Sequence, residues 1–423
     1  MRTAREWIWQ MMAVSGIMAI IYATPGSAQR AAGLPTSEAA RQDRADAAIR
    51  AALAKQVFPG AVLVVGSTER IGFAKGYGRG TWSPRSRTPS PATSLWDLAS
   101  LTKVIATTGV VARLVDRGAL DLETPVSRFV PQFGGFGRDA ITVRMLLDHT
   151  SGLRPFLRFW AAPSRDSAYA LLWHERLQRA PGASAVYSDL NAILLGLVIQ
   201  AATGDSLDIA VRKEVIEPLG LMQTGFRPPE SVWKRAMPTG RNAGEPVVGI
   251  VNDRNAESLG GAVGHAGLFA TGLDVARVAQ AWLAAARGTD SSWIHPATAQ
   301  RFLVRTPNSG SRFLGWDGRD PAPADPKNGS LNSPKNESIF GTVAGPRVFG
   351  HTGWTGTMMW MDPDADRFMV LLTNRSYDPK RRDTFAALKQ ARANVSTAVA
   401  LPALRPVPTM AAAPCSVVRP ATC

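Results

Sequence analysis

Residues 61–76 read AVLVVGSTERIGFAKG, two apolar runs on either side of a polar turn. Runs of this length with a short connection predict a β-hairpin. Similar strand-like runs, Thr355–Met361 and Arg367–Asn374, return near the other end of the chain around a turn rich in Asp and Pro. Strands at both ends, with helix-like sequence between them, predict one sheet built from both ends of the chain and a helical domain inserted into it.

The sequence outside these strands completes the predicted organisation. Apolar residues at helical spacing predict helices at 36–55, Leu101–Asp116, Val143–Leu147, Leu190–Ala202, Asp274–Ala286 and 383–399. One domain should therefore span 36–400, with its sheet from about 55–80 and 340–375 and its helical part from about 100–300. Residues 306–338 are rich in Pro, Gly, Asn and Ser and predict a long exposed loop, and residues 401–423 predict a disordered tail.

The N-terminus carries the parts of a secretory signal. Arg2 and Arg5 precede an apolar run from Trp7 to Ala23, and small residues ending at Ala28 follow. This order predicts a signal peptide over 1–28, although an uncleaved membrane anchor also fits the length of the run. We therefore expect a periplasmic or secreted protein, whose only membrane contact is that anchor if it is retained.

Composition excludes several classes of protein. The 423 residues are 45% hydrophobic and 19% charged, which is ordinary for a globular chain. The net charge of +15 comes from scattered arginines without a basic block, so no nucleic-acid partner is predicted. The two cysteines, Cys415 and Cys423, could pair or remain free thiols. The five histidines lack metal-ligand spacing and no nucleotide-binding motif occurs, so we predict no metal and no cofactor.

The first candidate catalytic motif is SLTK, from Ser100 to Lys103. Residues three apart on a helix share a face, so the Lys103 amine should lie beside the Ser100 hydroxyl. A serine needs such a base, and a buried lysine loses its proton more easily. The apolar sequence VIATTGVVA follows Lys103 and predicts a buried helix. Taken alone, the motif also fits a helix-capping serine and a surface lysine.

Two further motifs carry candidate site residues. Tyr187 begins YSD at a loop–helix junction, where a tyrosine near a lysine can pass a proton, although simple packing before a helix cap fits as well. His351 begins HTGW just before a predicted strand, whose edge could pair with an extended substrate and supply an oxyanion N–H. There His351 could donate to a substrate carboxylate, and Gly353 would allow a substrate backbone to approach closely.

The order and spacing of these three motifs resemble the serine β-lactamase and penicillin-binding-protein superfamily, most of all its branch of class C β-lactamases, DD-peptidases and family VIII esterases. Residues 146–153 (LLDHTSGL), 264–269 (GHAGLF) and 372–375 (LTNR) resemble further parts of that pattern. The resemblance implies an α+β fold of the αβα-sandwich type. A mixed antiparallel sheet would be flanked by terminal helices, with an inserted all-helical domain and the site between the two.

The resemblance also implies roles for individual residues. Ser100 would be acylated, and Lys103 and Tyr187 would handle its proton. The N–H groups of Ser100 and Trp354 would form the oxyanion hole. The substrate-binding site would be lined by Asp189, His351, Thr352 and Gly353.

Two positions depart from the family pattern. Asp189 stands where the family usually has Asn, and an ionised Asp only accepts hydrogen bonds and could pair with Lys103. His351 stands where β-lactamases usually have Lys, so a permanent cation is missing at neutral pH. Both departures weaken the case for efficient β-lactamase activity.

We therefore interpret the chain as an exported serine hydrolase that forms an acyl-enzyme on Ser100. Its substrate would be an amide or ester in a small molecule or a peptidoglycan peptide, such as a D-Ala-D-Ala-type peptide. A DD-carboxypeptidase comes first, a family VIII-like carboxylesterase second and a weak β-lactamase third. A non-catalytic penicillin-binding or peptidoglycan-sensing module is the alternative of another class, although a binder needs no activated serine.

Overall fold

The computed structural model describes residues 37–240, 246–319, 339–342, 344–378, 380 and 382–401. Three sequence predictions therefore lie outside the described residues. They are the signal segment, the second half of the long loop, and the tail with its two cysteines.

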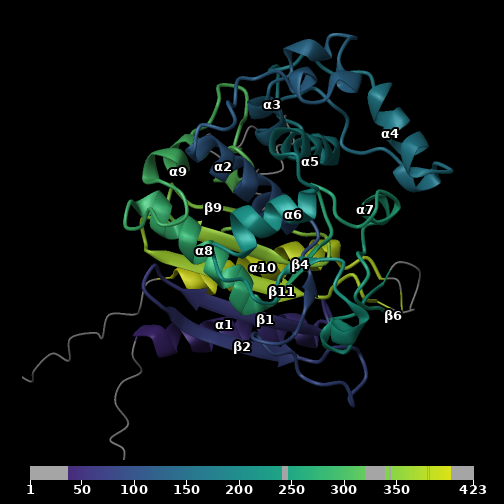
Figure 1. The fold of residues 1–423 in the computed structure, drawn as a ribbon. Helices are drawn as coiled ribbons and strands as arrows, with labels where there is room; N and C mark the ends of the chain where they lie inside the picture. The colour runs from purple at the N-terminus through teal and green to yellow at the C-terminus, as the bar shows by residue number, and fades with distance from the viewer. Residues whose placement is uncertain are drawn as a thin grey trace, which may run out of the picture. The chain divides into compact units, whose positions relative to one another are not determined.

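A six-stranded antiparallel sheet forms the centre of the fold, in the order β2-β1-β11-β10-β9-β8 (Figure 1). Its strands are β1 (Gly60–Gly66), β2 (Ile71–Gly78), β8 (Asp317–Gly318), β9 (Phe349–Thr352), β10 (Met358–Asp362) and β11 (Arg367–Thr373). The first strand pairs with the last, from Ala61 opposite Thr373 to Gly66 opposite Phe368. This pairing confirms that the two ends of the chain build one sheet.

Helices cover both faces of the sheet. Helices α1 (Ser37–Ala54) and α10 (Phe385–Ala400) pack on one face with Leu63 and Trp360, and α8 (Gly272–Arg287) packs on the other with Val62 and Val64. Successive residues of a strand point to opposite faces, so β1 supplies both hydrophobic clusters and is buried throughout. The predicted αβα layering is confirmed. Because Leu63 is buried between the layers, Leu63→Ala should lower the free energy of unfolding by about 2–5 kcal/mol.

The inserted region, between β2 and β8, is mainly helical. Its α-helices are α2 (Thr108–Asp116), α3 (Val143–Leu147), α4 (Arg165–Trp173), α5 (Asp189–Thr203), α6 (Leu207–Val211), α7 (Arg254–Ser258), α8 and α9 (Pro296–Phe302). Short strands accompany them, namely β3 (Trp96–Asp97), β4 (Gly225–Phe226), β5 (Thr239–Gly240), β6 (Pro246–Val247) and β7 (Leu268–Ala270). Gly204 ends α5 in the left-handed conformation, which glycine adopts without strain.

The predicted strand Thr355–Met361 is wrong at its N-terminal end. Residues 353–357 form a turn, and β10 begins only at Met358. Gly353 donates to the carbonyl of Thr357 (2.7 Å) and Gly356, at φ +107°, donates back to Gly353 (3.0 Å). Glycine takes this backbone conformation readily, so the chain reverses here instead of extending. The sequence missed β9, which contains His351, and the short β8 in the predicted loop.

Among the described helices, none is by itself long and apolar enough to cross a membrane. Helix α5 and residues 207–216 meet the length and composition test as a pair bent by 79°. Most residues of α5 are buried in the hydrophobic cluster of the helical region, which accounts for their apolar character.

Candidate active site

Ser100 lies three residues after the end of the short strand β3, which pairs with β7. Ala99 has a φ of +48°, a conformation that non-glycine residues adopt rarely, and its N–H donates to the Asp97 carboxylate (2.9 Å). Strained backbone of this kind persists only where the surrounding structure enforces it, and it clusters at functional sites. The strained turn thus fixes the point at which Ser100 enters the following helix.

Lys103 lies one turn later, in a five-residue π-helical turn from Lys103 to Thr107. The residue is 4% exposed. Its Nζ donates to Ser100 Oγ (3.0 Å) and to the carbonyl of His265 (3.0 Å), and forms an ion pair with Asp189 Oδ1 (2.8 Å). The structure therefore bears out the predicted burial of Lys103 beside Ser100 and its pairing with Asp189.

Tyr187 completes the group around the nucleophile. Its hydroxyl donates to Ser100 Oγ (3.0 Å), and its ring centroid lies 5.1 Å from Lys103 Nζ. On another side the ring contacts His149, with 4.9 Å between ring centroids. His149 Nδ1 accepts from the Ser188 N–H (3.2 Å) and from the Asn191 side chain (2.9 Å), so the imidazole that supports Tyr187 is held in one orientation.

These contacts set the resting protonation of the group. Burial lowers the pKa of Lys103, but Asp189 and Tyr187 together outweigh burial, so its pKa is raised. Burial raises the pKa of Tyr187; Lys103 counteracts this and Asp189 adds to it, and the net pKa is raised. At neutral pH the site therefore holds an ammonium and a neutral phenol, so Lys103 is a proton-handling cation and no free base at rest.

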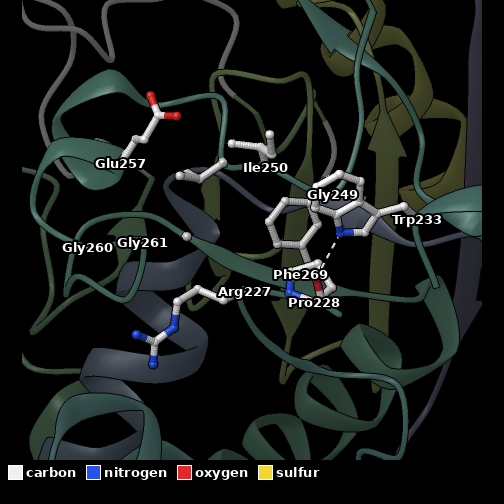
Figure 2. A pocket seen from close by; sticks show the side chains of 11 residues that line it. Arg227, Pro228, Trp233, Gly249, Ile250, Glu257, Gly260, Gly261 and Phe269 are labelled. Carbon is white, nitrogen blue, oxygen red and sulfur yellow. Dashed lines mark hydrogen bonds between the residues drawn. The ribbon is translucent and has the colours of Figure 1, made fainter. Parts of the chain in front are cut away.

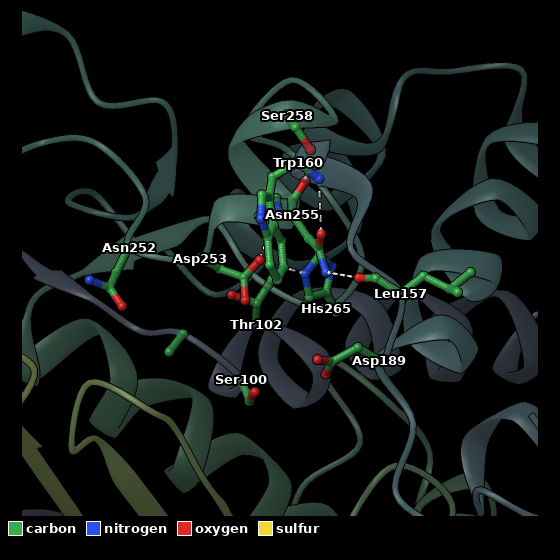
Figure 3. A network of polar contacts seen from close by, with 12 residues as sticks. Ser100, Thr102, Leu157, Trp160, Asp189, Asn252, Asp253, Asn255, Ser258 and His265 are labelled. Carbon is green, nitrogen blue, oxygen red and sulfur yellow. Dashed lines mark hydrogen bonds and ion pairs between the residues drawn. The ribbon is translucent and has the colours of Figure 1, made fainter. Parts of the chain in front are cut away.

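Residues 264–269 (GHAGLF) provide a hydrogen-bond acceptor for Lys103. The His265 carbonyl accepts from Lys103, while His265 Nε2 contacts Asp253 Oδ1 at 3.0 Å. Asp253 also accepts from the N–H of Ala256 and so caps α7. Figure 3 shows His265 and Asp253 of this network, with Ser100 and Asp189 nearby. It explains why this segment belongs to the motif pattern although none of its side chains reaches Ser100 by a hydrogen bond among the described contacts.

The turn 353–357 is attached to the segment that leads into Ser100. Thr355 Oγ1 donates to the carbonyl of Asp97 (2.8 Å), and Thr357 Oγ1 donates to that of Leu98 (2.9 Å). A Cβ on Gly353 would lie 2.6 Å from the Leu98 carbonyl oxygen. The chain itself makes a close approach that requires this glycine, and the approach of a substrate backbone stays a prediction.

His351 is an acceptor in this site rather than the predicted donor. Its Nδ1 contacts the Thr352 carbonyl (2.8 Å), and a carbonyl only accepts, so Nδ1 carries the hydrogen. Burial, with further effects of Lys103 and Arg312, lowers the pKa of His351 to about 4, although Asp317 opposes it. At neutral pH Nε2 is therefore a bare acceptor, buried and without a hydrogen-bond partner among the described residues. It suits a substrate N–H or O–H group and not a carboxylate.

Arg312 is a cation near the site that sequence reasoning missed. Its guanidinium lies 5.1 Å from the centroid of the Tyr187 ring and pairs with Asp317 (2.6 Å). Asp317 belongs to β8, in the predicted loop, and nothing in the local sequence indicates this contact. Lys103 and Arg312 are the two described cations nearest to Tyr187. Each of them forms an ion pair with a carboxylate.

The remaining predicted residues lie at the same place or next to it. Thr352 ends β9, and β8 pairs only with Phe349 and Gly350, so the outer edge of β9 is uncovered by β8 at the HTG motif. Trp354 is 58% exposed, and its ring stacks on Phe385 with 5.7 Å between centroids. The three motifs therefore converge, as predicted. Among the described residues, no group of three His, Cys, Asp or Glu side chains could hold a metal ion.

A separate cavity of about 380 Å³ lies outside this group of residues (Figure 2). None of the predicted site residues lines it. Its wall is mainly apolar and glycine-rich, formed by Arg227, Pro228, Trp233, Gly249, Ile250, Val251, Glu257, Gly260, Gly261, Gly267 and Phe269. Val251 adjoins Asn252, whose N–H donates to Asp97, so one chain segment borders both the cavity and the base of the nucleophile turn.

Comparison with known proteins identifies the family. The family model described as Beta-lactamase matches residues 45–393. The chain belongs to this family. It is a serine hydrolase of the serine β-lactamase and penicillin-binding-protein superfamily.

The proteins similar to this chain carry several names. The chain is 32% identical to an N-acetylmuramyl-L-alanine amidase of Bacillus subtilis (strain 168), over 76% of this chain and 78% of the relative. It is 29% identical to a protein of Escherichia coli (strain K12) provisionally named D-alanyl-D-alanine carboxypeptidase, over 76% and 80%. Among solved structures, the hydrolase EstCE1 shares the fold, with a TM-score of 0.67 and 19% identity over 86% of this chain and 100% of that one.

Proposed function

We propose that this chain is an exported amidohydrolase that cleaves an amide bond of a peptidoglycan-derived peptide through an acyl-enzyme on Ser100. The observation that carries the proposal is the position of Ser100 Oγ, which lies 3.0 Å from both Lys103 Nζ and the Tyr187 hydroxyl. A nucleophile within hydrogen-bond reach of its proton-handling groups is the requirement for covalent acyl transfer.

The arrangement supports a proton relay through Tyr187. This relay does not require Lys103 or Tyr187 to be deprotonated in the resting enzyme. Ser100 Oγ attacks the substrate carbonyl and its proton passes to the Tyr187 oxygen, while the Tyr187 proton passes to the leaving amine. The amide C–N bond breaks and a serine ester remains. Water then attacks the ester with the same proton traffic reversed, which releases the acid. Throughout, Lys103 stabilises negative charge that develops on the Tyr187 oxygen.

The charges around Ser100 favour an amide with no free carboxylate beside it. His351 presents a bare acceptor, and both nearby cations already have carboxylate partners, Asp189 and Asp317. The amide between an N-acetylmuramyl group and L-alanine has this character when the alanine is linked to a further residue. The Bacillus subtilis relative is named for that bond.

A D-Ala-D-Ala carboxypeptidase is the second candidate, and Arg312 is the observation that favours it. Its guanidinium lies against the Tyr187 ring and is 13% exposed. A substrate carboxylate could replace Asp317 as its partner, since a guanidinium can bind a carboxylate through two parallel hydrogen bonds. The Escherichia coli relative bears this name.

Export is part of the proposal because peptidoglycan lies outside the cytoplasm. Its support is the basic, apolar and small-residue sequence of the first 28 residues. N-terminal sequencing of the protein recovered from the periplasm or medium tests it. A mature chain that begins after Ala28 is expected, and a protein retained in the cytoplasm with Met1 intact would contradict it.

The test of the acyl-enzyme is intact-protein mass spectrometry after exposure to benzylpenicillin, together with turnover of two substrates. The substrates are N-acetylmuramyl-L-alanyl-D-isoglutamine and diacetyl-L-Lys-D-Ala-D-Ala. We expect Ser100→Ala to lose adduct formation and to lower turnover by about a thousandfold or more. Ser94→Ala is the matched control, since the hydroxyl of this buried serine, among the described hydrogen bonds, accepts from the Ser90 N–H.

The outcomes separate the candidates. Ser100-dependent cleavage of the muramyl peptide supports the amidase, whereas cleavage of the D-Ala-D-Ala peptide alone supports the carboxypeptidase. Turnover by Ser100→Ala within a few-fold of wild type would overturn both.

A further inference from the structure

Arg392 is a buried cation of the C-terminal helix α10 that has no carboxylate partner among the described ion pairs. The residue is 4% exposed and lies on the helix face that also buries Leu388 and Val395. Its Nη2 donates to two backbone carbonyls, those of Gly353 (2.7 Å) and Thr357 (2.8 Å). Burying a guanidinium without an anion is costly, so this contact needs a reason beyond packing.

The Gly353 carbonyl and the Trp354 N–H belong to the same peptide group. A trans peptide is planar, and its C=O and N–H point in opposite directions. When Arg392 holds the carbonyl oxygen, it also fixes the direction of the Trp354 N–H, which faces away from Arg392. A cation on the oxygen draws electrons from the amide and makes the N–H a stronger donor, as hydrogen bonds in a chain polarise one another.

Arg392 keeps its charge under working conditions. Burial, with a contribution from the neighbouring Arg375, lowers the pKa of Arg392 to about 9. The guanidinium therefore remains protonated at neutral pH and can polarise the peptide.

Arg375 gives an internal comparison. It is 7% exposed, and its Nη2 donates to the Trp354 carbonyl at 3.3 Å. That peptide group carries the N–H of Thr355, which has no predicted part in the reaction. The two arginines thus hold adjacent peptides of one turn, and only one of these peptides contains the predicted oxyanion donor.

We propose that Arg392 is a positioning residue of the oxyanion hole, which orients and polarises the Trp354 N–H through the Gly353 carbonyl. The inference rests on the proposed function, in which Ser100 attacks a carbonyl whose oxygen becomes negative. Its effect belongs to the transition state, so it should appear in the rate of acylation more than in substrate affinity.

The experiment compares Arg392→Gln with Arg375→Gln in the full chain. Two readouts are taken, namely acylation by p-nitrophenyl acetate and the infrared frequency of the ester carbonyl in the benzylpenicillin adduct. We expect Arg392→Gln to slow acylation by about 10–100-fold with KM nearly unchanged, somewhat less than the loss of a whole oxyanion donor. The ester band should shift to higher frequency, because a weaker donor polarises the carbonyl less. Arg375→Gln should leave the band in place and the rate within about threefold.

Each result decides whether Arg392 positions the Trp354 N–H or only contributes to the packing of α10. An Arg392→Gln enzyme with the wild-type band and rate, or an equal shift in Arg375→Gln, would overturn the inference. If Arg392→Gln does not fold, Arg392→Lys replaces it, since it keeps the charge and changes the donor geometry. A smaller shift in the same direction supports the inference, and an unchanged band and rate would assign Arg392 to folding alone. Wild-type protein without Ser100-dependent acylation by either reagent would overturn the proposed function itself.

Discussion

Lys103 and Arg392 are both buried cations at the active site, and the two halves of the site use them differently. Each residue is 4% exposed. Lys103 pairs with the Asp189 carboxylate, and the net effect raises its pKa, whereas the described hydrogen bonds of Arg392 go to two carbonyls and burial lowers its pKa. In the proposed mechanism the Asp189 carboxylate ties Lys103 to proton transfer, and the two carbonyls tie Arg392 to the orientation of a backbone dipole. The two proposals thus give the two buried charges different roles.

Removal of the Tyr187 hydroxyl should have the largest effect on the nucleophile half. Tyr187→Phe keeps the ring against His149 and Lys103 but loses the contact to Ser100 Oγ. General acid–base groups contribute about 10²–10⁴-fold, so kcat should fall by that amount with the fold intact. Steady-state kinetics with p-nitrophenyl acetate and the thermal unfolding midpoint are the measurements. A kcat within threefold of wild type would assign the relay to Lys103 alone.

The Asp189→Asn substitution should leave Lys103 as a buried cation without a carboxylate partner, like Arg392. Asp189 raises the pKa of both Lys103 and Tyr187, so Asp189→Asn should lower both. Because the proposed relay works with Lys103 protonated and Tyr187 neutral, the falling limb of the kcat/KM profile on the alkaline side should move to lower pH by about one to three units. The profile between pH 7 and 11 measures this shift. A limb that does not move would show that this carboxylate leaves the proton relay untouched.

Titration of His351 should produce the smallest effect, a change in stability, because the imidazole is buried without charge. Its pKa of about 4 in the fold is below its ordinary value near 6.5, so the unfolded chain binds a proton first as the pH falls. The stability that His351 contributes is full above pH 6.5 and is lost as the pH falls towards 4.

A matched variant isolates this contribution. His351→Gln keeps a hydrogen-bond donor for the Thr352 carbonyl but does not titrate. Wild type should lose about 2 kcal/mol more unfolding free energy than His351→Gln between pH 7 and pH 5. Urea unfolding at both pH values measures the difference. Equal losses would mean that His351 is hydrated or charged in the folded protein.

The sequence by itself predicted the helices and strands that build the layers of the fold, and it singled out Ser100, Lys103 and Tyr187 as the candidate catalytic group. Apolar periodicity places β1, β2, β11, α5, α8 and α10 within a few residues, because both faces of the sheet and one face of each helix must be buried. The spacing of Ser100 and Lys103 is a local property of a helix, so it too can be read directly. Asp189 could be paired with Lys103 in advance, since the motifs that contain them were expected to meet.

Tertiary structure alone decided the contacts that join distant segments. His351 could be taken for a donor until Thr352 fixed its hydrogen, and Arg312 lay in a sequence that predicted only a loop. Arg392 interrupts an apolar helix face, which is a signal in the sequence, but its partners lie 35 and 39 residues away on the turn 353–357. Local propensity gives no information on such pairs, because their energies depend on burial and geometry that exist only after the sheet and the helices have packed.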